Sequence, residues 1–207
     1  MIFEPKIEEY LHTLVPERPP VLAEMEAYAA ENNFPIIGPQ VGRFLYQMAQ
    51  VTEARRVLEL GSGFGYSAFW FAMAMGEKGK ITLTDGDQEN LTRAEEYFQR
   101  AGLKSRFKFR VGDALETARS LDKRFDIILN DIDKEAYPDT IEVAAARLHK
   151  GGLFITDNVL WSGRVCDETQ DAATRGVVEF TRRLFDDPRF FTTIVPLRDG
   201  LAVAVRV

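Results

Sequence analysis

Five short hydrophobic runs alternate with amphipathic segments through the middle of the chain. The runs cover Arg56–Leu60, Lys80–Asp85, Phe107–Asp113, Asp126–Asp131 and Gly152–Asp157. Apolar runs of this length are typical of parallel strands that are covered on both faces. The segments between them predict helices over Tyr66–Met75, Gln88–Ala101, Ala114–Ser120 and Ala136–Leu148. Strand–helix alternation indicates right-handed crossovers and a doubly wound parallel sheet.

Both ends of the chain depart from this alternation. The first part predicts three helices, over Glu4–Leu14, Val21–Asn32 and Gln40–Val51, with prolines between them. Near the other end, a helix is expected over Thr169–Asp186 with Thr169 as its N-cap. Two β-rich runs, Phe190–Leu197 and Leu201–Val207, then flank the turn Arg198-Asp199-Gly200 and predict a hairpin. We therefore expect an α/β, Rossmann-like sheet of about seven strands whose last strand is antiparallel, as in methyltransferases.

Composition narrows the class of protein. With 207 residues, 45% of them hydrophobic, the chain can form one domain over residues 1–207, in which residues 1–39 form an N-terminal helical cap or dimer segment. The net charge of -6 argues against a nucleic-acid surface. The chain has no apolar run long enough to span a membrane, and its N-terminus does not resemble a signal peptide. Its one cysteine, Cys166, cannot form an intrachain disulfide, which is typical of a cytoplasmic protein.

A glycine-rich turn follows the first strand of the alternating region. It reads Gly61-Ser62-Gly63-Phe64-Gly65, and glycines allow a backbone to approach a ligand closely. The dinucleotide fingerprint needs a third glycine where this chain has Tyr66, so a cofactor without pyrophosphate, S-adenosylmethionine (SAM), is favoured. Asp85 ends the next strand and could accept hydrogen bonds from ribose hydroxyls. A tight turn that binds nothing is the alternative, and Glu59 and the Gly112-Asp113-Ala114 turn weaken it.

Oxygen-bearing side chains follow the last two strands of the alternation. Asp131, Asp157 and Asn158 offer the oxygen ligands that Mg²⁺, Mn²⁺ or Ca²⁺ prefer. A cation there would lower the pKa of a bound hydroxyl, and Lys134 is close enough in sequence to take its proton. The alternative is that the aspartates cap helices and that Lys134 is a solvated surface residue.

Three motifs together resemble the cation-dependent O-methyltransferases, which include the caffeoyl-CoA and catechol types and their small bacterial relatives. The motifs are Val57–Ser67, Asn130–Lys134 and Asp157–Gly163, and the last two are the more specific. Asp85 stands where many relatives have glutamate, and Asn130 stands where the strand is usually apolar.

The resemblance implies methyl transfer from SAM to one hydroxyl of a vicinal diphenol. By position, Asp131, Asp157 and Asn158 would bind the cation and Lys134 would be the general base. The residues expected around SAM are Glu59, Gly61, Ser62, Gly63, Ser67, Asp85, Asp113, Ala114 and Asp133. The resemblance also implies a homodimer.

The substrate is left open by these observations. Trp161 could form a wall of a pocket for a small phenolic molecule, or it could be an ordinary packed aromatic. The acidic charge gives no preference for a coenzyme A ester over a free phenol.

Two other functions are alternatives to methyl transfer. A nicotinamide-dependent oxidoreductase is opposed by Tyr66, and a non-catalytic SAM-binding protein has no need of Asp131, Lys134, Asp157 and Asn158 together.

Overall fold

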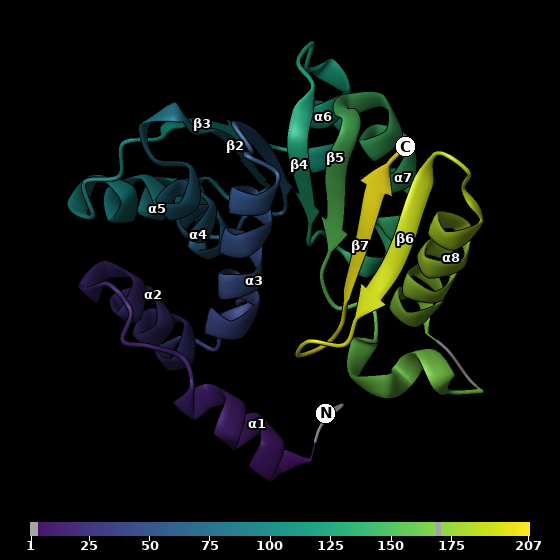
Figure 1. Ribbon diagram of the computed structural model, residues 1–207, viewed down its shortest axis with the longest axis horizontal. Coiled ribbons are helices and arrows are strands. Elements are labelled where there is room, and N and C mark those ends of the chain that lie inside the picture. Colours follow the sequence, from purple (N-terminus) through teal and green to yellow (C-terminus); the bar gives the residue numbers. More distant parts are fainter. Residues whose placement is uncertain (1–3, 169–170) are drawn as a thin grey trace.

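One seven-stranded sheet forms the centre of the protein, in the order β3-β2-β1-β4-β5-β7-β6 (Figure 1). The computed structural model describes residues 4–168 and 171–207. The strands are β1 (Arg56–Leu60), β2 (Lys80–Asp85), β3 (Arg106–Val111), β4 (Phe125–Asn130), β5 (Leu148–Thr156), β6 (Phe190–Val195) and β7 (Leu201–Arg206). β1 to β5 pair in parallel, whereas β7 is antiparallel to both β5 and β6. The predicted fold class is confirmed.

Helices cover both faces of this sheet. They are α1 (Pro5–Thr13), α2 (Pro20–Glu31), α3 (Gly38–Val51), α4 (Tyr66–Met75), α5 (Gln88–Arg100), α6 (Ala114–Ser120), α7 (Tyr137–Arg147) and α8 (Ala172–Asp186), with short 3-10 turns η1 (Gly76–Lys78), η2 (Lys134–Ala136) and η3 (Trp161–Cys166). Side chains alternate along each strand, so Val57 packs with α2 to α5 and Leu58 with α6 to α8. None of the described helices is long and apolar enough to cross a lipid bilayer.

Most predicted elements lie within two residues of their observed bounds, with two larger differences. β5 begins at Leu148, four residues before the predicted start, because the chain passes from α7 directly into a pairing of Leu148 with Phe125. The register of this pairing shifts before Ile127. α8 begins at Ala172, where the Asp171 side chain accepts from Thr174 N. The expected start at Thr169 is therefore wrong, and Thr169 itself lies outside the described residues.

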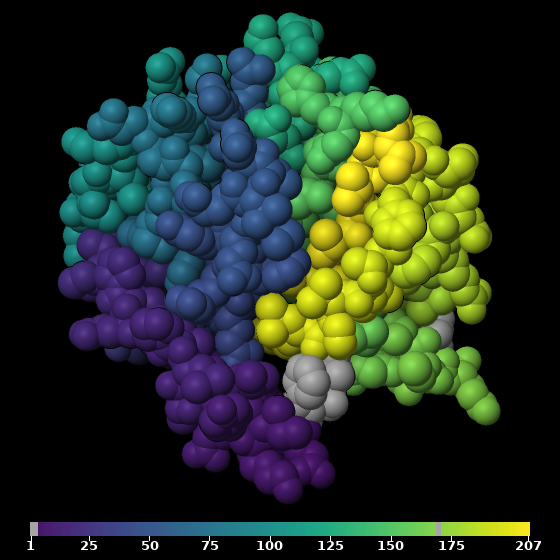
Figure 2. All heavy atoms as spheres, viewed as in Figure 1, coloured from purple at the N-terminus to yellow at the C-terminus, as the bar shows by residue number. Residues whose placement is uncertain are grey.

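The N-terminal segment packs unevenly. α2 buries Leu22, Met25 and Ala29 against the core, but α1 buries no residue. In Figures 1 and 2, α1 projects from one end of the molecule, below α2 and α3. α1 therefore leaves apolar side chains, Ile7 and Tyr10, that the rest of the described chain does not cover.

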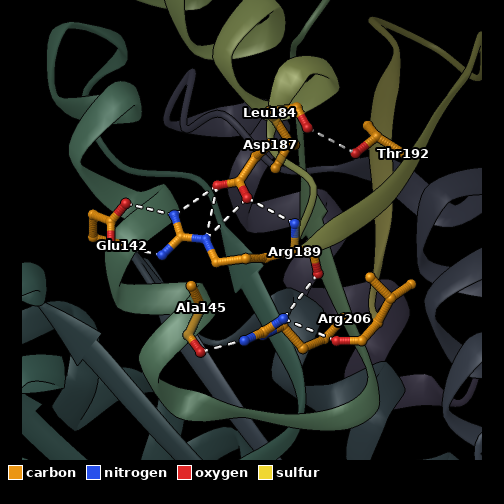
Figure 3. A network of polar contacts seen from close by, with 8 residues as sticks. Glu142, Ala145, Leu184, Asp187, Arg189, Thr192 and Arg206 are labelled. Carbon is orange, nitrogen blue, oxygen red and sulfur yellow. Dashed lines mark hydrogen bonds and ion pairs between the residues drawn. The ribbon is translucent and has the colours of Figure 1, made fainter.

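A polar cluster joins α7, α8 and the C-terminal hairpin (Figure 3). Arg189 donates to Asp187 at 2.9 Å and to Glu142 of α7 at 2.9 Å. Arg206 of β7 donates to the Arg189 carbonyl at 3.0 Å. None of these residues lines the large cavity described below. We therefore assign this cluster to holding the antiparallel edge of the sheet.

Candidate active site

A cavity of about 1010 Å³ opens at the carboxyl ends of the central parallel strands. This is the edge at which open α/β sheets bind ligands. All but one of the predicted site residues line the cavity: Gly61, Ser62, Gly63, Ser67, Asp85, Asp113, Ala114, Asp131, Asp133, Lys134, Asp157, Asn158 and Trp161. The exception, Glu59, is fully buried in β1. The topology thus brings together residues that are almost a hundred positions apart in sequence.

The glycine turn after β1 forms one wall of the cavity. Gly61 has a φ of 78°, and a Cβ at this position would lie 2.5 Å from the Asp131 carbonyl oxygen. The neighbouring Gly63 N–H donates to the Asp85 carboxylate at 2.8 Å. The other oxygen of Asp85 accepts from the Asn90 side chain at 3.1 Å. Asp85 therefore ties the turn to the end of β2 and is held in place at the cavity edge.

Glu59 is a buried acid beneath this turn. Neither of its oxygens has a hydrogen-bond partner among the described residues. Burial raises the pKa of Glu59 to about 8, against the opposing effect of the nearby Ser67 and Ser62 hydroxyls. An unpaired buried acid is costly, and a cationic group beside it would offset that cost. The site therefore fits SAM, because its amino-acid end carries an ammonium group and Ser62 and Ser67, whose hydroxyls lie near Glu59, line the cavity.

Two acids, Asp131 and Asp157, directly follow the ends of β4 and β5 and line the cavity. Burial raises the pKa of both, and for Asp157 the charge of Asp131 raises it further. Two cations oppose this effect: Lys134 Nζ lies 2.8 Å from Asp131, and Arg198 lies 3.7 Å from Asp157. The arrangement attracts positive charge.

The chemistry of these donors fits a hard divalent cation. Asn158 adds a carboxamide next to Asp157, and two carboxylates with one carboxamide leave room for water or substrate oxygens. The described residues hold no group of three or more His, Cys, Asp or Glu side chains arranged to bind a metal ion. The predicted set does not count as such a group, because Asn158 contributes a carboxamide and only Asp131 and Asp157 are acids.

Lys134 sits between the acids and two aromatic rings. Its side chain is only 12% exposed, and its Nζ lies 4.8 Å from the centre of the Tyr137 ring and 5.6 Å from that of Trp161. This is not the solvated surface lysine of the alternative interpretation. Trp161 lines the cavity, as expected of a pocket wall.

Asp113, at the turn after β3, caps a helix. The Asp113 side chain accepts from Glu116 N at 2.7 Å and so caps α6. Asp113 also lines the cavity. Its carboxylate is therefore partly used by the protein itself.

Sequence reasoning missed three residues that shape the site. Tyr137 is fully buried, and its hydroxyl donates to the Asp157 carbonyl at 2.9 Å. The sequence does offer a signal that Tyr137 belongs to the site, because it follows Lys134 by only three residues. Arg198 reaches the cavity from the hairpin turn, and nothing in the local sequence indicates that. Tyr66 also lines the cavity, and its hydroxyl donates to Glu26 of α2 at 2.7 Å.

The loop before α3 closes another side of the cavity. The lining residues there are Phe34, Pro35, Ile36 and Ile37. Phe34 packs edge-on against Phe64 of the glycine turn, with ring centres 4.8 Å apart. The contact between Tyr66 and Glu26 fixes α2 beside the same turn. The N-terminal segment is thus part of the cavity wall.

Known proteins share this architecture and sequence. A family model described as O-methyltransferase matches residues 13–207. A catechol O-methyltransferase from Niastella koreensis is 31% identical, and the match covers 99% of this chain and 97% of that protein. An O-methyltransferase from Bacillus cereus, solved in complex with SAH, superposes with a TM-score of 0.88 at 27% identity, over 98% of this chain and 97% of the other.

A second similar structure was solved with the methyl donor SAM bound. An O-methyltransferase from Streptomyces achromogenes, in complex with SAM, gives a TM-score of 0.89 at 25% identity, covering 98% of this chain and 96% of that chain. These matches favour the methyltransferase over the nicotinamide-dependent oxidoreductase. With the cavity, the glycine turn and the unpaired Glu59, they lead to one conclusion: the chain belongs to the O-methyltransferase family and is a SAM-dependent enzyme.

Proposed function

We propose that this enzyme methylates one hydroxyl of a vicinal diphenol and that it requires a divalent cation. The observation that carries the proposal is that Asp131, Asp157, Asn158 and Lys134 line the same cavity as the glycine turn. The name of the Niastella koreensis relative, a catechol O-methyltransferase, agrees with this substrate class.

The cation requirement is supported by the repulsion between two acids. Burial raises the pKa of both carboxyls, and the charge of Asp131 raises the pKa of Asp157 further. Mg²⁺, bound by these acids and Asn158, would supply Lewis acidity that lowers the pKa of a bound phenol hydroxyl. A vicinal diphenol has two adjacent oxygens, and this matches the open positions that such a three-ligand site leaves.

Lys134 is the base in this proposal. Its Nζ is held by Asp131 and by the carbonyl of Ile132, at 2.8 and 3.3 Å. It would take the proton of the phenol hydroxyl as the phenolate oxygen bonds to the methyl carbon and the carbon–sulfur bond breaks. The main contribution of the protein is positioning, because oxygen, carbon and sulfur must lie in line. Trp161 forms a flat wall against which an aromatic acceptor could stack.

The test is methyl transfer from labelled SAM to a panel of catechols, in Mg²⁺ and in EDTA. The panel contains caffeate, its coenzyme A ester, dihydroxybenzoate and a catechol flavonoid. Transfer that EDTA abolishes and Mg²⁺ restores supports the proposal. Transfer that persists in EDTA would remove the cation from it. Tight SAM binding without transfer to any diphenol would favour another acceptor or a non-catalytic protein.

We also propose that the enzyme is a homodimer formed through its N-terminal segment. Among the described residues, α1 buries none of its side chains, and Ile7 and Tyr10 of the helix and Leu14 just after it are exposed. Exposed apolar side chains on one helix are typical of an interaction surface. Sedimentation of the full chain should give the mass of two copies, and Tyr10→Glu should shift it towards one. A single-copy mass for the unaltered chain would refute the proposal.

A further inference from the structure

Arg198 stands in an unusual place in the cavity wall. It belongs to the turn between β6 and β7, on the antiparallel edge of the sheet, yet it lines the cavity formed by the parallel strands. Its guanidinium lies 3.7 Å from Asp157, and its side chain is 40% exposed. A Cβ on Gly38, at the start of α3, would lie 3.9 Å from Arg198 Nε. The side chain therefore spans the space between the acids and the N-terminal wall.

The backbone around Arg198 is held firmly. The next residue, Asp199, accepts from Ser162 N at 2.5 Å and from the Asn158 side chain at 3.4 Å. Leu160 N and Val159 N donate to the carbonyls of Asp199 and Gly200, at 2.9 and 3.1 Å. The hairpin turn is thus bound to the loop after β5, which carries Asn158 and Trp161. In the space-filling view the yellow hairpin tip lies beside the blue α3 segment (Figure 2).

Arg198 also has a strained backbone. Its φ is 55°, a value that residues with a side chain rarely adopt. Asn158, Trp161 and Ser162, in the loop bound to this turn, have positive φ as well. Such strain tends to gather where function demands a particular placement. A glycine would relieve it at position 198, so the guanidinium is retained at a cost.

The charged residues that line the cavity indicate that the Arg198 guanidinium is free to bind a ligand. Among the described residues that line the cavity, the acids are Asp85, Asp113, Asp131, Asp133, Glu135 and Asp157, and the basic residues are Lys134 and Arg198. Lys134 is already paired with Asp131 at 2.8 Å. Arg198 contacts its acid only loosely, at 3.7 Å, and a cation held by Asp157 would weaken that contact further. Its donors are therefore available to a ligand.

We propose that Arg198 determines acceptor specificity by binding a carboxylate on the diphenol, so that the enzyme prefers free aromatic acids. A guanidinium binds a carboxylate through two parallel hydrogen bonds. One guanidinium among six acids suits a single negative charge better than a phosphate dianion. The inference rests on the proposed function and extends it: free acids are preferred over coenzyme A esters, which lack the carboxylate and add phosphates.

The kinetic test compares 3,4-dihydroxybenzoate with its neutral amide in the Mg²⁺-loaded enzyme. Wild type should favour the acid by about 10- to 100-fold in kcat/KM, mainly through KM, as for hydrogen bonds between charged groups. Arg198→Gly and Arg198→Asn should remove this preference. Both replacements tolerate positive φ, so both should fold. Arg183→Gln, on the exposed side of α8, is the control and should keep the preference.

A binding measurement separates this inference from the proposed reaction. Calorimetry with SAH-saturated protein should show tighter binding of dihydroxybenzoate to wild type than to Arg198→Gly, with SAM affinity equal in both. That result without turnover of any catechol would overturn the proposed reaction and keep the carboxylate site. Turnover with equal preference in wild type and variants would overturn the site and keep the reaction. A loss of SAM affinity in Arg198→Gly would assign the guanidinium to SAM and overturn the inference. Tighter binding of the coenzyme A ester than of the acid would also overturn it.

Discussion

Lys134 Nζ lies 2.8 Å from a carboxylate oxygen of Asp131, inside a cavity that both residues line. Lys134 begins the short turn η2, which leads directly into α7, so the pair is fixed by local backbone as well as by charge. The same carboxylate is a proposed ligand of the cation. The proposed base therefore lies beside a proposed ligand of the cation that would bind the phenol oxygen.

Replacing Lys134 with alanine should separate chemistry from binding. We expect turnover to fall by about 100- to 10,000-fold, the usual contribution of a general base. SAM affinity should stay within about twofold, because Lys134 is paired with Asp131 rather than with the glycine turn. Calorimetry and single-turnover assays check both. Unchanged turnover would remove Lys134 from the mechanism, and lost SAM affinity would make it a binding residue.

Asp157→Asn should change the response of the protein to metal. Asp131 and Asp157 repel each other, so one amide should stabilise the metal-free protein. In wild type, Mg²⁺ should raise the melting temperature, and in Asp157→Asn this rise should be lost, with Mg²⁺ affinity weaker by about 100-fold or more. Thermal melts with and without Mg²⁺ give both results. Equal Mg²⁺ shifts in the two proteins would contradict the proposed ligand set.

The buried Glu59 should make the free energy of unfolding depend on pH. Its folded-state pKa of about 8 lies above the unfolded value of 4.5, so the folded protein keeps a proton that the unfolded chain loses in this range. Stability should therefore fall as pH rises from 4.5 to 8. Glu59→Gln should remove the loss of stability that Glu59 causes, which is at most about 5 kcal/mol at pH 8. Urea unfolding at several pH values measures it, with the exposed Glu95→Gln as control. Parallel pH profiles for Glu59→Gln and wild type would refute it.

The close packing of α3 on α4 depends on one glycine. A Cβ on Gly42 would overlap the indole ring of Trp70. Trp70 is 6% exposed and cannot swing out without opening the core. We expect Gly42→Ala to lower the free energy of unfolding by about 1–3 kcal/mol. Gly86→Ala, where a Cβ meets nothing within 4 Å, is the matched control and should change it little. Equal changes in the free energy of unfolding for the two variants would show that α3 and α4 can move apart to accept the added methyl group.

Much of the fold and of the site could be predicted from local sequence. Buried runs such as Phe125–Asn130 specify strands, because a parallel strand covered on both faces must be apolar along its length. The ends of those strands then carry Asp131 and Asp157, and parallel pairing alone brings such ends to one edge. The starts of β5 and α8 were mistaken, because they depend on pairing with Phe125 and on capping by Asp171.

Tertiary structure decided what local patterns do not encode. Whether Glu59 is paired, whether Lys134 is solvated and where Arg198 points all depend on neighbours from distant segments. Arg198 looks like an ordinary turn residue in the sequence, and it becomes part of the cavity only because β7 inserts antiparallel beside β5. Hydrophobic periodicity is read along the chain and so determines elements and edges. Charge, burial and pKa are set by everything within a few ångströms, and only the folded chain brings those groups together.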